Sequence, residues 1–366
     1  MNQPANCCLP IDFVKQPCPR QHPGDEYALN ITQTKFSGRM RAVYTLVALG
    51  AFVAAALSPS QATGQEPRYP ARPVRLIIPV SPGSPTDTYT RRIASVAQVK
   101  LGAPIVIENR AGAGSVIGAT QLARAAADGY TLMASTSVPF IASTVLIKSV
   151  PYDSMTDFRY ITKLFVSTPV LVASTASNVD SLKALIAQAR ARSITFGSFG
   201  PGSIHQLSLD AFSKQAGIAM VEVPYRAPAQ AMQAVLTNEV ALGYTAPVQA
   251  IHYRDQGLVK ILAAIGTQRL ALLPQVPTFV ESGFDAPSLR TSFWTGIVGR
   301  AGTPEAVVAT IHNVFAEALR DPQIEEFFAR VGNRLIGNSP QDFEREIREE
   351  FSQLVPILKA LNIQPE

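Results

Sequence analysis

The chain has 366 residues, of which 47% are hydrophobic and 16% are charged. This composition is that of a globular protein with room for two α/β domains, and it argues against a disordered chain. The formal net charge of +5 is small and the basic residues are scattered singly, which excludes the basic stripe of a nucleic-acid-binding protein.

A secretory signal peptide is predicted at residues 40–62. It has a basic start, an apolar run at 43–57 and the ending Ser60-Gln61-Ala62, which are the three parts of such a signal. The apolar run is shorter than the roughly 20 residues that span a bilayer, so cleavage is favoured over a membrane anchor. We therefore expect an exported, periplasmic protein whose signal is cleaved near Ala62.

The segment 1–39 precedes this signal and is expected to be a non-native N-terminal extension. All three cysteines, Cys7, Cys8 and Cys18, lie in it. The mature protein would therefore have no disulfide and no cysteine metal site.

From Tyr69 onward, short β-branched runs alternate with amphipathic stretches, which predicts an α/β architecture with mostly parallel sheets. The predicted strands are 74–80, 104–108, 130–134, 170–173, 193–197, 220–223, 240–244, 260–265 and 295–298. The predicted helices include 88–99, 182–190, 306–319 and 343–354. Their starts are marked by Ser or Thr caps and first-turn prolines at Ser181, Thr303-Pro304 and Ser339-Pro340, and Asp321-Pro322 separates two C-terminal helices.

Two lobes are predicted from this order of elements. Lobe I comprises 66–167 and 290–366, and lobe II comprises 168–289. The extended, proline-bearing segments 167–169 and 285–292 are the expected crossings between the lobes.

Two loops, each leaving a predicted strand and entering a helix, carry the main functional prediction. Helix N-termini attract anions because their first N–H groups lack intrahelical partners and the helix dipole adds partial positive charge. Two such loops on separate lobes predict a clamp for a carboxylate or phosphate. The candidate ligand-binding residues are Gly83, Ser84, Thr86 and Asp87 in the loop 82–87, and Ser198, Gly202 and Ser203 in the loop 197–203.

Each of these residues also has a purely structural interpretation. Asp87 is either a helix N-cap or a residue that orders the loop around a ligand, and Ser84 and Thr86 either bind an anion or stabilise a turn. Further strand-end candidates are Thr136 and Ser137. His205 either donates to the anion or packs at a helix start, and Tyr225 either closes over the ligand or is a half-buried aromatic.

Other function classes receive less support. The glycines of 111–118 are similar to a dinucleotide-binding turn, but no acidic residue follows at the required distance, so a packing turn is favoured. The main alternative is an exported α/β hydrolase or transferase that acts on a small carboxylate-containing substrate through His205. Neither Ser198 nor Ser203 has the glycine spacing of a nucleophile elbow, and no histidine pair has metal-ligand spacing. We therefore expect no enzyme, cofactor or metal.

In its motifs the chain resembles the periplasmic receptors of tripartite tricarboxylate transporters, the Bug-type proteins. The motifs occur in order through the predicted mature chain. They are Tyr69-Pro70 with 74–79, the segments 108–114, 128–132 and 151–153, Val223-Pro224-Tyr225, and 273–278.

The resemblance implies a two-lobed, type II-like "Venus flytrap" receptor that captures small organic acids and delivers them to membrane permease subunits. In that family the first strand–helix loop and the glycine-rich loop of the other lobe hold a ligand carboxylate. Those loops match 82–87 and 198–203 here.

The chain departs from the family pattern at four places. Ser84-Pro85 stands where glycines are common, His205 lies one place before the usual histidine, Ala227 replaces a glycine, and Thr245 replaces an acidic residue. We expect a monomeric carboxylate receptor in which Tyr225 and Thr245 shape the distal end of the ligand site.

Overall fold

The computed structural model describes residues 69–361, except 199, 201, 226 and 227. The predicted extension, signal peptide and cysteines, together with Ala227, lie outside the described residues. The two sheets described below belong to one compact unit.

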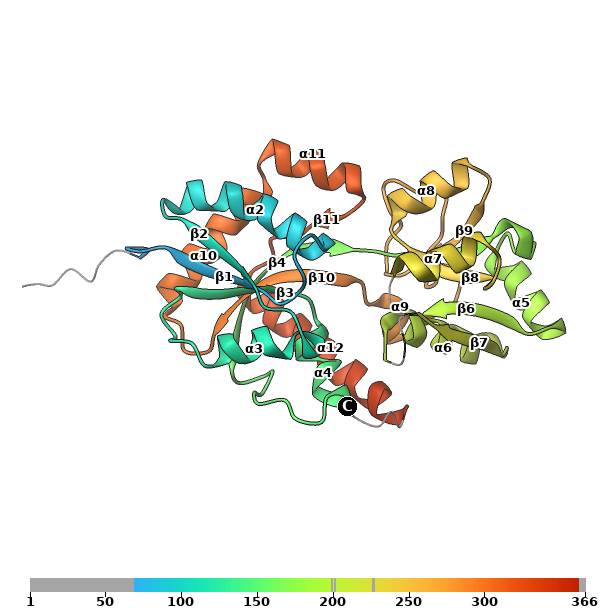
Figure 1. Cartoon of the computed structure of the whole chain (residues 1–366), viewed down its shortest axis with the longest axis horizontal. Helices are drawn as coiled ribbons and strands as arrows, with labels where there is room; N and C mark the ends of the chain where they lie inside the picture. The colour runs from blue at the N-terminus through green and yellow to red at the C-terminus, as the bar shows by residue number, and fades with distance from the viewer. Residues whose placement is uncertain (1–68, 199, 201, 226–227, 362–366) are drawn as a thin grey trace, which may run out of the picture. The chain divides into compact units, whose positions relative to one another are not determined.

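Eleven described strands form these sheets, and helices connect them (Figure 1). The strands are β1 Val74–Ile78, β2 Ile105–Asn109, β3 Thr131–Ser135, β4 Phe158–Ser167, β5 Val170–Ser174, β6 Ile194–Ser198, β7 Met220–Pro224, β8 Leu242–Thr245, β9 Val259–Ala264, β10 Phe293–Arg300 and β11 Arg334–Leu335. The helices are α2 Pro85–Leu101, α3 Val116–Ala123, α4 Ser143–Leu146, α5 Leu182–Ala191, α6 Ile204–Ala216, α7 Pro228–Leu236, α8 Pro247–Asp255, α9 Pro287–Arg290, α10 Glu305–Leu319, α11 Pro322–Val331 and α12 Pro340–Ala360. The 3₁₀ turns are η1 Ala113–Ser115, η2 Val138–Phe140 and η3 Thr175–Ser177.

The first sheet has six strands in the order β11-β4-β10-β3-β1-β2. β1 pairs in parallel with β2 and β3, whereas β10 is antiparallel to both β3 and β4. The second sheet has the order β7-β6-β8-β5-β9. Here β6 is parallel to β7 and β8, and β5 is antiparallel to β8 and β9.

Both sheets are therefore mixed, and the prediction of mostly parallel sheets is wrong. The antiparallel partners are the strands at which the chain changes sheets. It leaves the first sheet through β4, enters the second through β5, and returns to the first through β10. A strand that returns in this way lies opposite in direction to its neighbours, and β4 pairs with β10 over their whole length.

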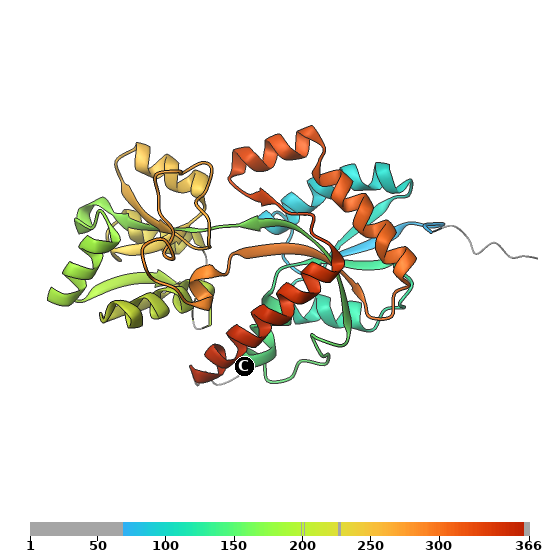
Figure 2. The same ribbon diagram turned by 180° about the vertical axis from the view of Figure 1, so that it is seen from behind.

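Helices cover both faces of each sheet (Figure 1). On the first sheet, α2, α10 and α11 pack on one face and α3 and α12 on the other. Figure 2 shows α12 along its full length from the opposite side. On the second sheet, α5 and α6 share one apolar layer, and α7 and α8 share the other. The buried positions of β1 and β5 face both layers, which explains their almost uninterrupted apolar sequences.

Helix punctuation was predicted with mixed success. Ser181 and Ser339 are N-caps whose hydroxyls accept backbone N–H bonds, and Asp321 caps α11. The first long helix begins at Pro85 instead of residue 88, because Ser84 is its N-cap. Thr303 is not a cap: its hydroxyl donates to the Arg300 carbonyl, and Pro304 precedes the helix.

Two strands were missed, β4 and β11. β4 alternates buried residues with the half-buried Arg159 and Lys163, whose charges conceal its apolar pattern. Within the described residues, no helix combines the length and the hydropathy needed to cross a membrane.

Candidate functional site

The first predicted loop is organised by the carboxylate of Asp87. This buried side chain accepts bonds from the Gly83 N–H at 2.9 Å, the Arg91 Nε at 2.9 Å and the Asn109 Nδ2 at 2.8 Å. Asp87 is the third residue of α2 and not its N-cap, which is Ser84. Its contacts therefore support the loop-ordering interpretation and exclude the N-cap one.

The same contacts determine the charge of Asp87. Burial disfavours the carboxylate, but the hydrogen bonds from Asn109, Gly83 and Arg91 outweigh it and hold the pKa of Asp87 below its ordinary value. Asp87 is therefore ionised at neutral pH and serves the loop as a fixed internal acceptor.

The second loop has an equivalent carboxylate, Glu222 on β7. Its Oε1 accepts a short bond from the Ser198 hydroxyl, and its Oε2 accepts the Gln206 Nε2 at 2.8 Å. Ser198 Oγ in turn accepts the Gly200 N–H at 3.0 Å, and Gln206 Oε1 accepts the Gly202 N–H at 2.7 Å. Glu222 thus braces both ends of the loop, and the sequence analysis did not identify it.

These internal bonds correct the expectation that both loops present bare backbone N–H groups. Gly83 and Ser84 donate to Asp87 and to the Ser81 carbonyl, and Gly202 donates to Gln206. Pro85 has no N–H to offer. The side chains of Ser84 and Ser203 act as N-caps of α2 and α6. Among the described residues of α2 and α6, the first-turn N–H groups of Thr86 and Ile204 are available to a ligand.

His205 follows this cap on α6 and is buried against aromatic rings. Its ring lies 5.1 Å from that of Tyr244 and 5.4 Å from that of Phe293. Burial lowers the pKa of His205 to about 3, so the ring is neutral at physiological pH. It can contribute a neutral hydrogen-bonding group but no positive charge.

A cavity of about 230 Å³ brings together four of the predicted site residues. Ser137 contributes from the first-sheet part of the chain, and Gly202, Ser203 and His205 contribute from the second-sheet part. Phe293 of β10 and Leu354 of α12 complete its mostly apolar wall. Residues from segments far apart in the sequence thus share one concave surface, as a ligand site requires.

The other predicted residues do not line this cavity. Among them, the Tyr225 hydroxyl donates to Glu239 at 3.0 Å, the Thr245 hydroxyl donates to Gln249 at 2.6 Å, and Thr136 Oγ1 accepts the Val138 N–H at 3.4 Å. The residues outside the cavity lining are Gly83, Ser84, Thr86, Asp87, Thr136, Ser198, Tyr225 and Thr245. Their contact with a ligand stays a prediction.

Glu350 of α12 is a second site residue that sequence reasoning missed. It lines this cavity and a larger one of about 1000 Å³ beside the two chain crossings. Its Oε2 accepts the Trp294 Nε1 at 2.8 Å, whereas its Oε1 is buried without a hydrogen-bond partner among the described residues. Burial raises the pKa of Glu350, despite the opposing effects of the Trp294 bond and Lys163. The Glu350 carboxyl is therefore easier to protonate than the carboxyl of an exposed glutamate.

The glycine-rich segment 111–118 is a packing turn, as predicted. A Cβ on Gly118 would lie 2.7 Å from Pro79 Cβ and 3.3 Å from the Arg110 carbonyl oxygen. Ser115 donates from this turn to the Pro79 carbonyl at 3.0 Å. The small residues therefore allow α3 to approach β1 closely.

Solved structures with similar folds include several periplasmic receptors. Periplasmic binding protein BugD is 27% identical with a TM-score of 0.66 over 81% of this chain and 100% of its own. Rpa4515 of R. palustris with adipate is 27% identical with a TM-score of 0.68 over the same shares. MatC of Rhodopseudomonas palustris with bound malate is 26% identical, with a TM-score of 0.63 over 79% of this chain and 100% of MatC. These likenesses confirm the predicted two-lobed α/β receptor fold.

Sequence relatives agree with the structural ones. BugT of Bordetella pertussis is 31% identical over 317 residues, which are 86% of this chain and 96% of BugT. A UPF0065 protein of Cupriavidus necator is 32% identical over 320 residues, 87% of this chain and 95% of its own. The model of the tripartite tricarboxylate transporter family receptor matches residues 89–363. The chain therefore belongs to the tripartite tricarboxylate transporter receptor family.

Proposed function

We propose that this receptor binds a small organic carboxylate between its two lobes, in the periplasm, and delivers it to a permease of the tripartite tricarboxylate type. The family consists of substrate-binding receptors and not of enzymes, so the hydrolase or transferase alternative is wrong. The relatives with adipate and with malate make a dicarboxylate the first substrate class to test.

The observation that carries the proposal is the shared cavity of Ser137, Ser203 and His205. It lies at the start of α6, where the Ile204 N–H and the helix dipole favour a carboxylate. The neutral His205 ring can supply a directional hydrogen bond without adding a negative charge that would repel the ligand. This end is lined by the apolar residues Val138 of η2, Ile141 and Ala142 after it, and Leu354 and Leu358 of α12. They suit a short hydrocarbon chain better than a sugar.

A ligand that contacts both lobes stabilises the arrangement in which they are close, through contacts that each lobe alone cannot make. We propose that a permease recognises this liganded arrangement. The ordered loops support this mechanism because Asp87 and Glu222 fix their shapes before any ligand arrives, which reduces the entropy cost of binding.

Isothermal titration of the mature protein with mono-, di- and tricarboxylates of two to seven carbons tests the proposal. We expect saturable binding of at least one dicarboxylate, and weaker binding of its monoamide, which lacks one negative charge. Ser203→Trp, which fills the cavity beside His205, should abolish this binding, whereas Ser95→Trp on the exposed face of α2 should not. No heat with any acid would contradict the proposal.

A further inference from the structure

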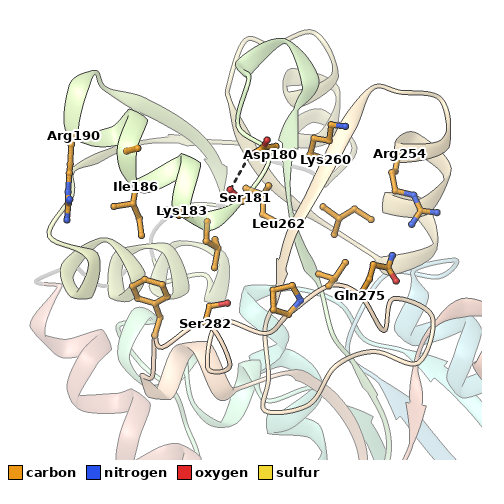
Figure 3. A pocket seen from close by; sticks show the side chains of 16 residues that line it. Asp180, Ser181, Lys183, Ile186, Arg190, Arg254, Lys260, Leu262, Gln275 and Ser282 are labelled. Carbon is orange, nitrogen blue, oxygen red and sulfur yellow. Dashed lines mark hydrogen bonds between the residues drawn. The ribbon is translucent and has the colours of Figure 1, made fainter.

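A second hollow lies on the second-sheet part of the molecule, and we call it the β9 groove. It has a volume of about 830 Å³ and is lined by α5, β9, α8 and the segment 275–284. Figure 3 shows Arg190 and Arg254 on opposite sides of it, with Lys183 and Lys260 between them. The groove shares no lining residue with the two cavities described above.

The groove is strongly basic for its size. Four of its lining residues are cationic and one, Asp180, is acidic. Arg254 pairs with its neighbour Asp255 at 2.8 Å, but Lys183, Arg190 and Lys260 form no ion pair with any residue between 69 and 361 that the structure describes. Their charges therefore remain uncompensated and create a positive potential that attracts an acidic partner.

β9 supplies an outward-facing backbone position in this groove, at Ile261. It is the last strand of its sheet. The bond from the Thr175 N–H to the Leu258 carbonyl sets the alternation of the ladder with β5. By this alternation the half-buried Ile261, which lines the groove, directs its N–H and C=O groups outward. Val259 has the same orientation but is buried and does not line the groove. Within the described chain these groups have no backbone partner, whereas Ala264 is already bonded to the passing segment through Pro277 and Phe279.

An apolar floor lies beneath the cations. Leu182, Leu262 and Val276 are buried, and Ile186 and Phe284 are half-buried. The groove therefore offers three features at once: outward N–H and C=O groups, apolar contacts and positive charge. An added strand would use all three, because its side chains alternate between the two sides of the sheet.

From this combination we infer that the β9 groove is a docking site for an extended, acidic segment of a partner protein, which adds to β9 as a further strand. Its backbone pairs with Ile261. Its carboxylates meet Lys183 and Lys260, and its apolar residues lie against Ile261 and Val276. This surface is separate from the carboxylate site, so the inference holds whatever solute the receptor binds.

A fluorescent peptide, acetyl-Glu-Val-Glu-Val-Glu-Val-Glu-amide, probes this inference by fluorescence anisotropy with the mature protein. We expect saturable binding that weakens as salt is added. The same peptide with proline at its centre has equal charge but lacks a central N–H, and it should bind at least about tenfold more weakly. Equal binding of both peptides would overturn the inference, as would full displacement by inorganic phosphate at matched ionic strength, because each would indicate a plain anion site.

Variants of the groove give a second, independent readout. The double variant Lys183→Glu, Lys260→Glu should bind the peptide at least about tenfold more weakly. Lys148→Glu, an exposed lysine elsewhere, is the matched control and should bind normally. Ile261→Pro removes one outward N–H and should weaken peptide binding. Its affinity for the solute should not change, and this unchanged affinity would show that the variant is folded. Unchanged peptide binding by the double variant, or self-association through β9 in place of peptide binding, would contradict the inference.

Discussion

At the scale of single residues, two carboxylates explain how this receptor shapes its loops: the buried Asp87 and the half-buried Glu222. Asp87 binds three donors around the first loop, and Glu222 binds two around the second. Asp87 accepts a backbone N–H of its loop directly, whereas Glu222 acts from β7 through the Ser198 and Gln206 side chains. These carboxylates are of a residue type that could contact a ligand, but here they stabilise the protein's own loops.

Asp87→Asn should lower the free energy of unfolding by about 1–3 kcal/mol, because a buried set of donors loses its charged acceptor. The folded-state pKa of Asp87 lies below its unfolded value, so the stability it contributes is present above pH 4 and is lost as the pH falls through the folded pKa. Urea unfolding at pH 7 and pH 3 checks both points. The variant should differ from wild type at pH 7 and approach it at pH 3, whereas exposed Asp255→Asn should match wild type at both.

Glu222→Gln should loosen the second loop. A glutamine there can still accept from Ser198, but its amide group faces the Gln206 Nε2, so two donors meet where one acceptor stood. We expect solute affinity to fall about tenfold, equivalent to about 1.4 kcal/mol, measured by titration calorimetry. Exposed Glu317→Gln is the control, and an unchanged affinity in Glu222→Gln would show that the brace does not matter for binding.

His205 should make the protein sensitive to acid. Its pKa falls to about 3 in the folded state and is about 6.5 when unfolded. Between these values the unfolded chain takes up a proton that the folded protein does not, so stability decreases as the pH is lowered, by up to about 1.4 kcal/mol per pH unit. Unfolding from pH 7 to pH 4 should show a shallower decline in His205→Gln than in wild type or in the exposed-site variant His252→Gln. Parallel curves for all three would contradict this assignment.

At the scale of elements, local chemistry was easier to predict than pairing. Ser181, Ser339 and Asp321 marked helix starts correctly because a cap bonds within its own turn. β4 was missed because Arg159 and Lys163 interrupt its apolar pattern, while their charges are satisfied by Glu344 and Glu346 from α12, some 180 residues away. No window of sequence around β4 contains those partners.

The candidate site, too, could be predicted only where its residues lie close together in the sequence. The strand–helix junctions identified both loops, and Ser137, Ser203 and His205 meet in one cavity. Glu222 and Glu350 could not be identified, because one acts across the parallel pair β6–β7 and the other from α12. The expectation of free backbone N–H groups in both loops was wrong for a related reason. The N–H groups of Gly83 and Gly202 are bonded to side chains four residues later in the chain, those of Asp87 and Gln206.

At the scale of the whole molecule, Gly202 is the point at which the second loop packs closely against α4 and α12. A Cβ there would lie 2.6 Å from Leu146 on α4 and 3.3 Å from Leu358 on α12, whereas a Cβ on Gly200 would meet nothing within 4 Å. Both glycines have positive φ, so an alanine strains the backbone at either position by about 1 kcal/mol.

Gly202→Ala should therefore cost about 1 kcal/mol more than Gly200→Ala, since it also crowds Leu146 and Leu358. It should weaken solute binding as well, because Gly202 lines the proposed ligand cavity. Thermal unfolding and titration of the two variants side by side test this. Equal losses in both would mean that only backbone strain counts and that the contact with Leu146 and Leu358 contributes nothing.

The central claim is that both lobes contact one carboxylate ligand, which lies at the start of α6. A crystal structure of the mature protein, saturated with the acid that titration identifies, tests it most directly. We predict a ligand carboxylate within hydrogen-bonding distance of the Ile204 N–H or Ser203 at the start of α6, and of Ser137 or Thr86 from the other lobe. A ligand that touches one lobe alone, or that lies away from both loops, would contradict the account.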